Sequence, residues 1–398
     1  MHKLSIGIVG LGQFGVEFVQ LFQQHPRVGR VALCDLDGHK RAQAAQRFSL
    51  SELYDSLDAI CASDLDALAI ITQPWLHAPQ AIQAMRAGKH VYTAVPIIMP
   101  ESGSGDEILD WCDKLIACCR GTGQLYMMGE TTYFRPETVM CRKRAADFGQ
   151  FVFVEAQYLH DTWLPTCNLI EVQRMRTGWS EAQVLKAGGD IPMHYPTHSI
   201  SAPISIMRAH CVSVSACGYA FPGDTYFRHD SLTGNPYCHE VALFTMSNGA
   251  IAQVTESRRN GHTGHEGVVR VIGTDASYER DTTDEYSGRW ATKTGASAID
   301  PRTYRDPLPG ALTSKLGGHG GSHAYLVDEF VNACADAHMP TINAWEAARY
   351  VAAGVMAHKS VMRGGERLKV PDWGDAPVNT PSASSTANTR ASTGATSV

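Results

Sequence analysis

Apolar residues in the first 125 or so positions alternate between short continuous runs and stretches with helical spacing. The short runs predict strands at 4–9, 31–34, 67–71, 90–93 and 124–128. Apolar residues that recur every three or four positions predict helices from Phe14 onward, at 81–87 and at 108–119. Alternation of strand and helix predicts an α/β fold, with a doubly wound parallel sheet of the Rossmann type.

The apolar pattern changes after residue 130, where a helix is predicted from Pro136 to about Gly149. Alternating apolar and polar residues then predict strands at 151–160, 241–246, 250–256, 268–272 and 277–280. Two further helices are predicted at 325–337 and 344–362. We therefore predict a C-terminal α+β domain with an open, mainly antiparallel sheet.

Composition excludes several classes of protein. The 398 residues are 44% hydrophobic and carry a net charge of -6, so we expect no nucleic-acid partner and no membrane partner. No stretch approaches the roughly 20 apolar residues that span a bilayer. The first residues contain no apolar signal core, so a cytoplasmic location is expected. The 11 cysteines form no Cys-x-x-Cys pair, and no metal site is expected.

One loop has the glycine pattern of a dinucleotide-binding site. The motif Gly10-x-Gly12-x-x-Gly15 lies between the first predicted strand and the first predicted helix. Gly10 and Gly12 allow a tight turn and close approach to a pyrophosphate, and Gly15 allows the helix to pack on the strand. A glycine-rich turn in another α/β protein is the alternative. The predicted cofactor contacts of this loop are Gly10, Gly12, Gln13, Phe14 and Gly15.

Asp35 lies 20 residues after Gly15, at the end of the second predicted strand. A carboxylate there receives the ribose hydroxyls of the cofactor and repels a 2′-phosphate, which favours NAD over NADP. Lys40 and Arg41 temper that preference. We therefore expect an NAD-binding Rossmann domain at 1–128, a substrate-binding α+β domain at 129–375 and a disordered tail at 376–398.

At this point the chain resembles the Gfo/Idh/MocA oxidoreductases, over almost its whole length to about residue 375. The segment Thr72-Gln73-Pro74, with His77, looks like the family's strand-to-helix segment beneath the nicotinamide half of the cofactor. The family usually continues with Glu-Lys-Pro, whose lysine serves catalysis, whereas this chain has Ala94-Val95-Pro96. The resemblance adds these residues to the predicted cofactor contacts: Thr72, Gln73, Pro74, His77, Val95 and Pro96.

A subgroup resembles this chain more closely, the family 109 glycoside hydrolases, which are NAD-dependent α-N-acetylgalactosaminidases. They too have Val-Pro in place of Lys-Pro, and four further short motifs follow in the same order. Here the motifs read Val95-Pro96-Ile97-Ile98-Met99, Met127-Met128-Gly129-Glu130, Glu155 with Tyr158 and His160, Tyr195-Pro196-Thr197-His198, and His319-Gly320-Gly321. The chain departs from the subgroup at Ala94, where a glutamate is expected, and in lacking a secretion signal.

The segment from Tyr195 to His198 also has the chemistry of a general base on its own. Pro196 suits the first position of a helix, so Tyr195 is predicted to cap the helix and His198 to lie in its first turn. The positive end of the helix favours a phenolate on Tyr195 and a neutral imidazole on His198. The alternative is a capping tyrosine and a hydrogen-bonded histidine without catalytic roles.

Tyr158 and His160 lie two positions apart in a predicted strand and share one face, while Glu155 points to the other. Glu130 follows a strand of the parallel sheet at the edge where such sheets bind ligands. A surface pair and a solvated loop carboxylate are the alternatives. The predicted catalytic residues are Glu130, Tyr158, His160, Tyr195 and His198, and the predicted substrate contacts are His194 and His319, for which an exposed residue and a structural turn are the alternatives.

The family 109 resemblance implies a glycosidase that uses NAD for transient oxidation at C3 of a sugar, elimination between C1 and C2, addition of water and re-reduction. In that scheme His198 takes the hydroxyl proton and Tyr195 the proton at C2. The alternative is an NAD-dependent sugar or cyclitol dehydrogenase that releases NADH. A non-catalytic dinucleotide sensor is the third hypothesis. The expected partners are a small sugar or glycoside and further copies of the chain, as a dimer or tetramer.

Overall fold

The computed structural model describes residues 3–161, 180, 191–231, 233–261, 265–281, 287–313 and 317–377. The tail expected at 376–398 therefore falls almost entirely outside the described residues. In the part of the chain that the structure describes, no helix combines the length and the apolar character needed to cross a membrane.

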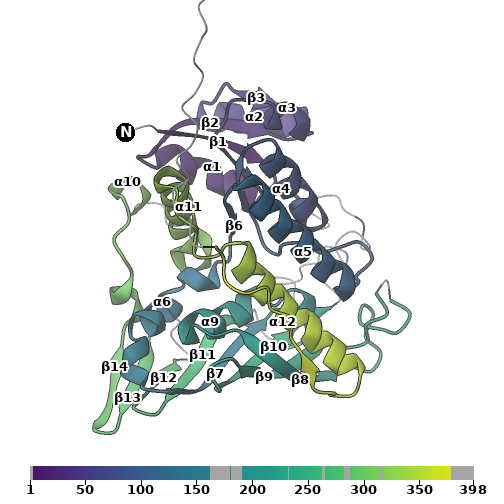
Figure 1. The fold of residues 1–398 in the computed structure, drawn as a ribbon, viewed down its shortest axis with the longest axis vertical. Coiled ribbons are helices and arrows are strands. Elements are labelled where there is room, and N and C mark those ends of the chain that lie inside the picture. The colour runs from purple at the N-terminus through teal and green to yellow at the C-terminus, as the bar shows by residue number, and fades with distance from the viewer. Residues whose placement is uncertain are drawn as a thin grey trace, which may run out of the picture.

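The N-terminal part forms a parallel six-stranded sheet with the order β3-β2-β1-β4-β5-β6. Its strands are β1 (Leu4–Val9), β2 (Val28–Cys34), β3 (Leu53–Tyr54), β4 (Ala67–Ile70), β5 (His90–Thr93) and β6 (Tyr126–Met128). Its helices are α1 (Gly15–Gln24), α2 (Gly38–Phe48), α3 (Leu57–Cys61), α4 (His77–Arg86) and α5 (Gly105–Thr122). The predicted Rossmann fold is thus confirmed, and it forms the upper part of Figure 1.

Burial explains why these strands read as continuous apolar runs. Every residue of β1 and of β4 is buried, because helices cover both faces of a doubly wound parallel sheet. Helix α2 was not predicted, because only Ala44 and Phe48 of its eleven residues are buried. Its start is marked by the cap residue Asp37, whose side chain accepts hydrogen bonds from the backbone of His39 and Lys40.

The C-terminal part contains a nine-stranded sheet with the order β14-β13-β12-β11-β7-β10-β9-β8-β15. Its strands are β7 (Phe151–Leu159), β8 (Cys211–Tyr219), β9 (His239–Met246), β10 (Ile251–Ser257), β11 (His265–Gly273), β12 (Ala276–Arg280), β13 (Gly288–Thr292), β14 (Gly295–Ile299) and β15 (Leu368–Lys369). Only β7 and β10 pair in parallel, so the predicted mainly antiparallel sheet is confirmed. Strands β8, β13 and β14 were not predicted.

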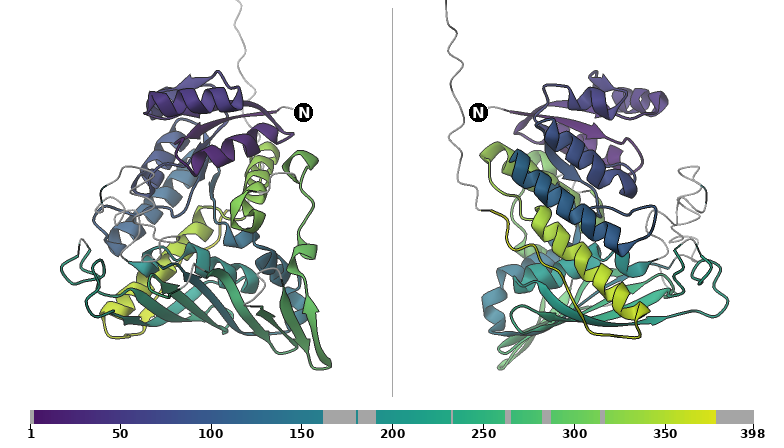
Figure 2. Two further views of the ribbon diagram at one scale, coloured as in Figure 1. Left: turned by 180° about the vertical axis from the view of Figure 1, so that it is seen from behind. Right: turned by 45° about the vertical axis from the view of Figure 1, so that its right-hand side comes forward.

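Three helices lie on one face of this sheet: α6 (Pro136–Lys143), α9 (Thr197–Met207) and α12 (Ala344–Met362), as the two views of Figure 2 agree. On the opposite face, Leu243 and Ile251 are about half exposed. The sheet is therefore open on one side, and its covered side faces the Rossmann part.

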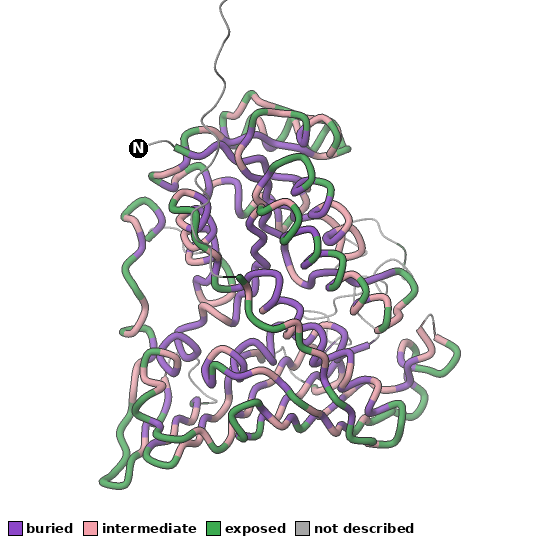
Figure 3. The backbone as a smooth tube through the Cα atoms, in the orientation of Figure 1, coloured by how far each residue is buried: buried purple, intermediate pink, exposed green. Residues whose placement is uncertain are grey.

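Helix α11 (Gly318–Asp336) joins the two parts, because it returns to the Rossmann sheet and packs on α1. His25 contacts Asp328 at 3.0 Å, and Arg27 forms an ion pair with Asp336. Buried residues extend from the Rossmann strands to the helices that cover the second sheet (Figure 3). The site residues described below lie along this junction.

Candidate active site

The glycine loop has the shape that a dinucleotide requires. Gly10 has φ 94°, and an added Cβ there would lie 2.4 Å from the carbonyl oxygen of Ile71. At Gly15 an added Cβ would lie 1.9 Å from the carbonyl oxygen of Gly10. At Gly12 it would meet no atom within 4 Å, so this face of the loop is open to a pyrophosphate. The loop therefore fits NAD, and a close approach of the cofactor at Gly12 stays a prediction.

Asp35 braces the same loop. Its Oδ2 accepts a hydrogen bond from the backbone N–H of Leu11 at 2.7 Å, and its Oδ1 accepts one from Asp37 at 2.9 Å. The Arg41 guanidinium donates to the carbonyl oxygen of Asp35. The carboxylate thus links the loop to the end of β2, and its contact with the cofactor ribose stays a prediction.

His77 holds together the two segments predicted to lie beneath the nicotinamide. Its Nδ1 lies 2.8 Å from the carbonyl oxygen of Pro96, and its Nε2 lies 3.1 Å from that of Thr72. Val95-Pro96 is a cis peptide. Gln73 precedes the short helix η1 (Pro74–Leu76). His77 is therefore fully engaged with backbone, and we interpret it as positioning this cofactor segment.

The turn before α9 differs in detail from the prediction. Helix α9 begins at Thr197 with Pro196 as its cap, one residue later than expected, and Tyr195 follows the short helix η5 (Pro192–His194). Burial, together with the neighbouring Tyr158 and Glu130, raises the pKa of Tyr195 well above its usual value. The expected phenolate is therefore wrong for the free protein, because the loss of water outweighs the field of the helix end.

Glu130 and His198 form a buried pair between the two parts of the molecule. Oε1 of Glu130 lies 2.8 Å from Nδ1 of His198, and the two side chains are 0% and 5% exposed. Burial opposes the charge on Glu130, but His198 and the backbone N–H of Thr132, at 2.7 Å, overcome it and lower its pKa. Because a charged carboxylate only accepts hydrogen bonds, Nδ1 of His198 donates this hydrogen bond, so in the neutral ring the lone pair is on Nε2.

Aromatic rings surround this pair. The ring of Tyr158 is stacked on His160 at 5.3 Å, as expected for one face of a strand, and it lies 5.2 Å from His198 and 6.1 Å from Tyr195. The ring of His319 lies 5.9 Å from that of His198. We call this set the site cluster: Glu130, Tyr158, His160, Tyr195, His198 and His319. It brings together the five predicted catalytic residues and one predicted substrate contact.

The site cluster reaches the glycine loop through Phe14. The ring of Phe14 lies 6.4 Å from that of His319 and 5.2 Å from that of His323. Since Phe14 precedes α1 in the loop that fits the pyrophosphate, the cluster lies beside the cofactor segment. Titratable side chains therefore lie next to the loop that fits the dinucleotide.

Comparison with known proteins agrees with this arrangement. Residues 4–130 match the Gfo/Idh/MocA model, described as an oxidoreductase family with an NAD-binding Rossmann fold. The similarity to this family's model covers the Rossmann part of the chain. The first part of the chain is accordingly an NAD-binding Rossmann domain.

Proteins similar to this chain include several that are named for family 109. A glycosyl hydrolase family 109 protein of Solibacter usitatus (strain Ellin6076) is 22% identical over 93% of this chain and 88% of that protein. A glycosyl hydrolase family 109 protein 2 of Shewanella sp. (strain ANA-3) is 28% identical, but the match spans 52% of this chain and only 45% of that protein. The chain thus spans less than half the length of that relative.

A solved structure shares the fold of this chain. Levoglucosan dehydrogenase, in complex with NADH and levoglucosan, superposes with a TM-score of 0.71 over 93% of this chain and 100% of that chain. The two sequences are 17% identical. The likeness establishes the two-part architecture.

Sequence reasoning missed a polar network beneath the turn that carries Tyr195. Glu256, which is fully buried, accepts hydrogen bonds from the hydroxyl of Ser199 at 2.5 Å and from Arg258 at 3.2 Å. Arg258 also donates to the carbonyl oxygen of Pro192 at 3.4 Å. The network therefore holds both ends of the turn that carries Tyr195.

A second buried pair lies beside it. Oε2 of Glu240 accepts the N–H of Met193 at 2.9 Å, and its other oxygen lies 2.6 Å from Nδ1 of His358. The ring of His194 packs 5.1 Å from that of His358. Burial lowers the pKa of His194 well below its usual value. The structure thus places His194 against α12, apart from the site cluster with which it was expected to act.

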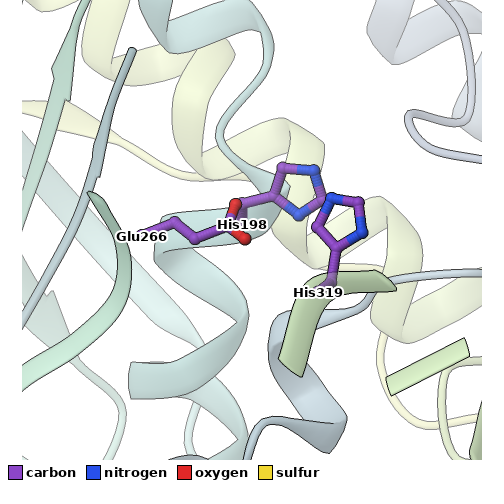
Figure 4. A group of neighbouring side chains, drawn as sticks. All are labelled: His198, Glu266 and His319. Carbon is purple, nitrogen blue, oxygen red and sulfur yellow. The ribbon is translucent and has the colours of Figure 1, made fainter. Parts of the chain in front are cut away.

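His198, Glu266 and His319 offer one ligand atom each, and these atoms lie within 4.8 Å of one another (Figure 4). Two imidazoles and one carboxylate are a ligand set that transition metals use. However, the Arg135 guanidinium forms an ion pair with Glu266, which is therefore already neutralised. We assign no ion to this group.

Proposed function

We propose that the chain is an NAD-dependent glycosidase that acts on a small sugar glycoside. In this reaction the sugar is oxidised transiently at C3, the group at C1 is eliminated with the proton at C2, water adds, and C3 is reduced again. Bound NAD supplies the hydride acceptor and later the hydride donor. The names of the relatives from family 109 support the extension from sugars to glycosides.

The observation that carries this proposal is the Glu130–His198 pair beside the glycine loop. In the neutral form of His198, Nε2 has the lone pair that accepts the proton of a sugar hydroxyl. The charged carboxylate of Glu130 orients the ring and stabilises the imidazolium that forms. This arrangement needs no lysine, which accounts for Val95 in place of the lysine of the wider family.

Tyr195 has a separate role in this scheme. Because its hydroxyl is protonated in the free protein, we assign it hydrogen-bond donation to the oxygen at C3 while elimination makes that oxygen negative. An imidazole of the site cluster then takes the proton at C2, which the neighbouring ketone makes acidic. Such a mechanism needs no pair of carboxylates across the glycosidic bond.

One reaction mixture tests the proposal. Protein loaded with NAD is incubated with an aryl glycoside in D₂O, and three signals are followed: aglycone release, deuterium at C2 of the sugar and NADH absorbance. Aglycone release with deuterium at C2 and no accumulation of NADH is the expected result, because the hydride returns to the sugar whereas the C2 proton exchanges with solvent.

Adding the free sugar to the same mixture tests the contrary outcome. A sugar or cyclitol dehydrogenase would accumulate NADH from the free sugar and leave the glycosidic bond intact. That pattern would replace the glycosidase with the dehydrogenase, in which the Glu130–His198 pair would act on the same hydroxyl without a later elimination.

A further inference from the structure

Two histidines form a hydrogen-bond relay at the start of α11. The backbone N–H of Gly318 donates to Nδ1 of His323 at 3.2 Å. Nε2 of the same ring lies 3.0 Å from Nδ1 of His319. Because a backbone N–H can only donate, Nδ1 of His323 has to be the nitrogen with the lone pair.

Both rings are neutral at ordinary pH, so their hydrogen bonds fix which nitrogen of each ring carries the proton. Burial lowers the pKa of His323 to about 4, and burial with nearby His198 lowers the pKa of His319 to about 2. A neutral imidazole carries one N–H. The proton of His323 therefore sits on Nε2 and is donated to Nδ1 of His319, so the proton of His319 sits on Nε2.

We propose that His319 presents a fixed N–H donor to a secondary hydroxyl of the substrate, and that His323 is the positioning residue that sets this tautomer. The inference rests on the proposed function, in which His198 faces the same hydroxyl with a lone pair. The two rings lie 5.9 Å apart and are inclined by only 28°. A hydroxyl between them donates to His198 and accepts from His319, and it keeps the second hydrogen bond when it becomes a ketone.

The backbone supports a dedicated role for His319. It has φ 54° and ψ 52°, in the left-handed region that residues other than glycine rarely occupy. Gly320 and Gly321 continue in the same region, and the regular helix begins after them. The hydroxyl of Ser322 donates to the carbonyl oxygen of His319 at 2.9 Å. The loop is thus shaped to hold this ring against Phe14 and His323.

Other charged groups near the relay do not reverse it. Glu17 lies 3.6 Å from Nδ1 of His323, beyond hydrogen-bond length, and its side chain is about half exposed. Arg135 pairs with Glu266, and its charge further disfavours a second proton on the ring of His319. A metal ion on Nε2 of His319 would require the opposite tautomer.

Nitrogen-15 NMR of histidine-labelled protein tests the tautomer directly, without substrate. Long-range coupling between ring protons and nitrogens distinguishes a protonated nitrogen from one with a lone pair, and a His319→Asn sample assigns the signal. We expect a protonated Nε2 and an unprotonated Nδ1 for His319. A proton on Nδ1 in the wild-type protein overturns the proposal.

A matched pair of substitutions tests the role of His323. Gln in His323→Gln has an amide that still donates to Nδ1 of His319, whereas Glu in His323→Glu only accepts and forces the proton of His319 onto Nδ1. We expect His323→Gln to retain kcat within about tenfold, and His323→Glu to lose about 10² to 10³ in kcat, as when one preorganised donor is removed. Equal losses in both variants would show a merely structural role and overturn the assignment.

Separate readouts distinguish this inference from the proposed function. The NMR signal of the wild-type protein reports the tautomer whether or not any glycoside is turned over. If the tautomer is as expected but neither glycosides nor sugars react, the proposed function fails and the relay stands. Thermal unfolding and NADH titration of each variant establish that it is folded before kcat is compared. Glu17→Gln is the matched control and should leave the NMR signal of His319 unchanged.

Discussion

Glu130 and His198 are separated by 68 residues in the chain, yet their contact decides which nitrogen of the imidazole carries the proton. Both residues were predicted from the sequence, Glu130 because it follows a strand and His198 because it lies in the first turn of a helix. Sequence reasoning could not pair them, because no local pattern encodes a contact between a loop after β6 and the first turn of α9. The pKa of Tyr195 was misjudged for the same reason, since burial depends on the whole fold.

The first testable prediction concerns two glycines of one loop. Gly12→Val should abolish NADH binding while leaving the thermal midpoint of unfolding nearly unchanged, because an added side chain there meets open space. Gly15→Val should unfold at a clearly lower temperature, because its Cβ would collide with the carbonyl oxygen of Gly10. Fluorescence titration with NADH and a thermal melt measure both. A stable Gly12→Val protein that still binds NADH would contradict the cofactor assignment.

A second prediction separates two steps of the reaction. Tyr195→Phe should still transfer hydride to bound NAD when substrate is added, but should fail to release aglycone, because only the elimination uses its hydroxyl. His198→Ala should slow hydride transfer itself by about 10² to 10⁴. Single-turnover absorbance of NADH and aglycone release measure the two steps. Activity like that of the wild type in both variants would mean that the site lies elsewhere.

At the scale of elements, the predictions succeeded where a segment has a strong period of its own. Helix α12 was predicted at its observed bounds, 344–362, because apolar residues recur throughout and Asn343 caps its start. Strand β14 was missed because four of its five residues are exposed and the fifth is only partly buried, so no alternation marks it. Inward positions of β9 and β10 hold Glu240 and Glu256 among apolar residues, and this break in the pattern is the signal that would have revealed the buried network.

Glu256 makes the stability of this part depend on pH. Burial raises its pKa from 4.5 to about 8, although Arg258 and Ser199 oppose the rise. The folded state therefore binds a proton that the unfolded state releases, so the contribution is present below the unfolded pKa and is lost as pH rises through the folded one. The thermal midpoint of the wild-type protein should fall between about pH 5 and about pH 9, and that of Glu256→Gln should fall less.

Melting curves at several pH values, run in parallel on both proteins, measure this difference. Glu279→Gln, at an exposed ion pair of β12, is the control and should melt with the same pH dependence as the wild type. If Glu256→Gln keeps the whole pH dependence of the wild type, the raised pKa of Glu256 is not its source.

At the scale of the whole molecule, we expect the chain to form a dimer or tetramer because one face of the nine-stranded sheet is open. Leu243 and Ile251 are about half exposed there, on the side opposite to α9 and α12. Leu243→Arg should shift the protein toward a monomer in analytical ultracentrifugation. Met362→Arg, at an equally exposed residue that ends α12, should not. A monomeric wild-type protein would contradict this prediction.

The junction between the two parts also limits how such proteins can be recombined. Glu130 follows the last strand of the Rossmann sheet, whereas His198 begins a helix on the second sheet, so each part contributes one half of a single proton acceptor. A chimera that takes one part from a relative with a different partner at either position would keep both folds and the dinucleotide loop, but would inherit an imidazole with no carboxylate to orient it. In this architecture, exchanging modules preserves cofactor binding more readily than chemistry.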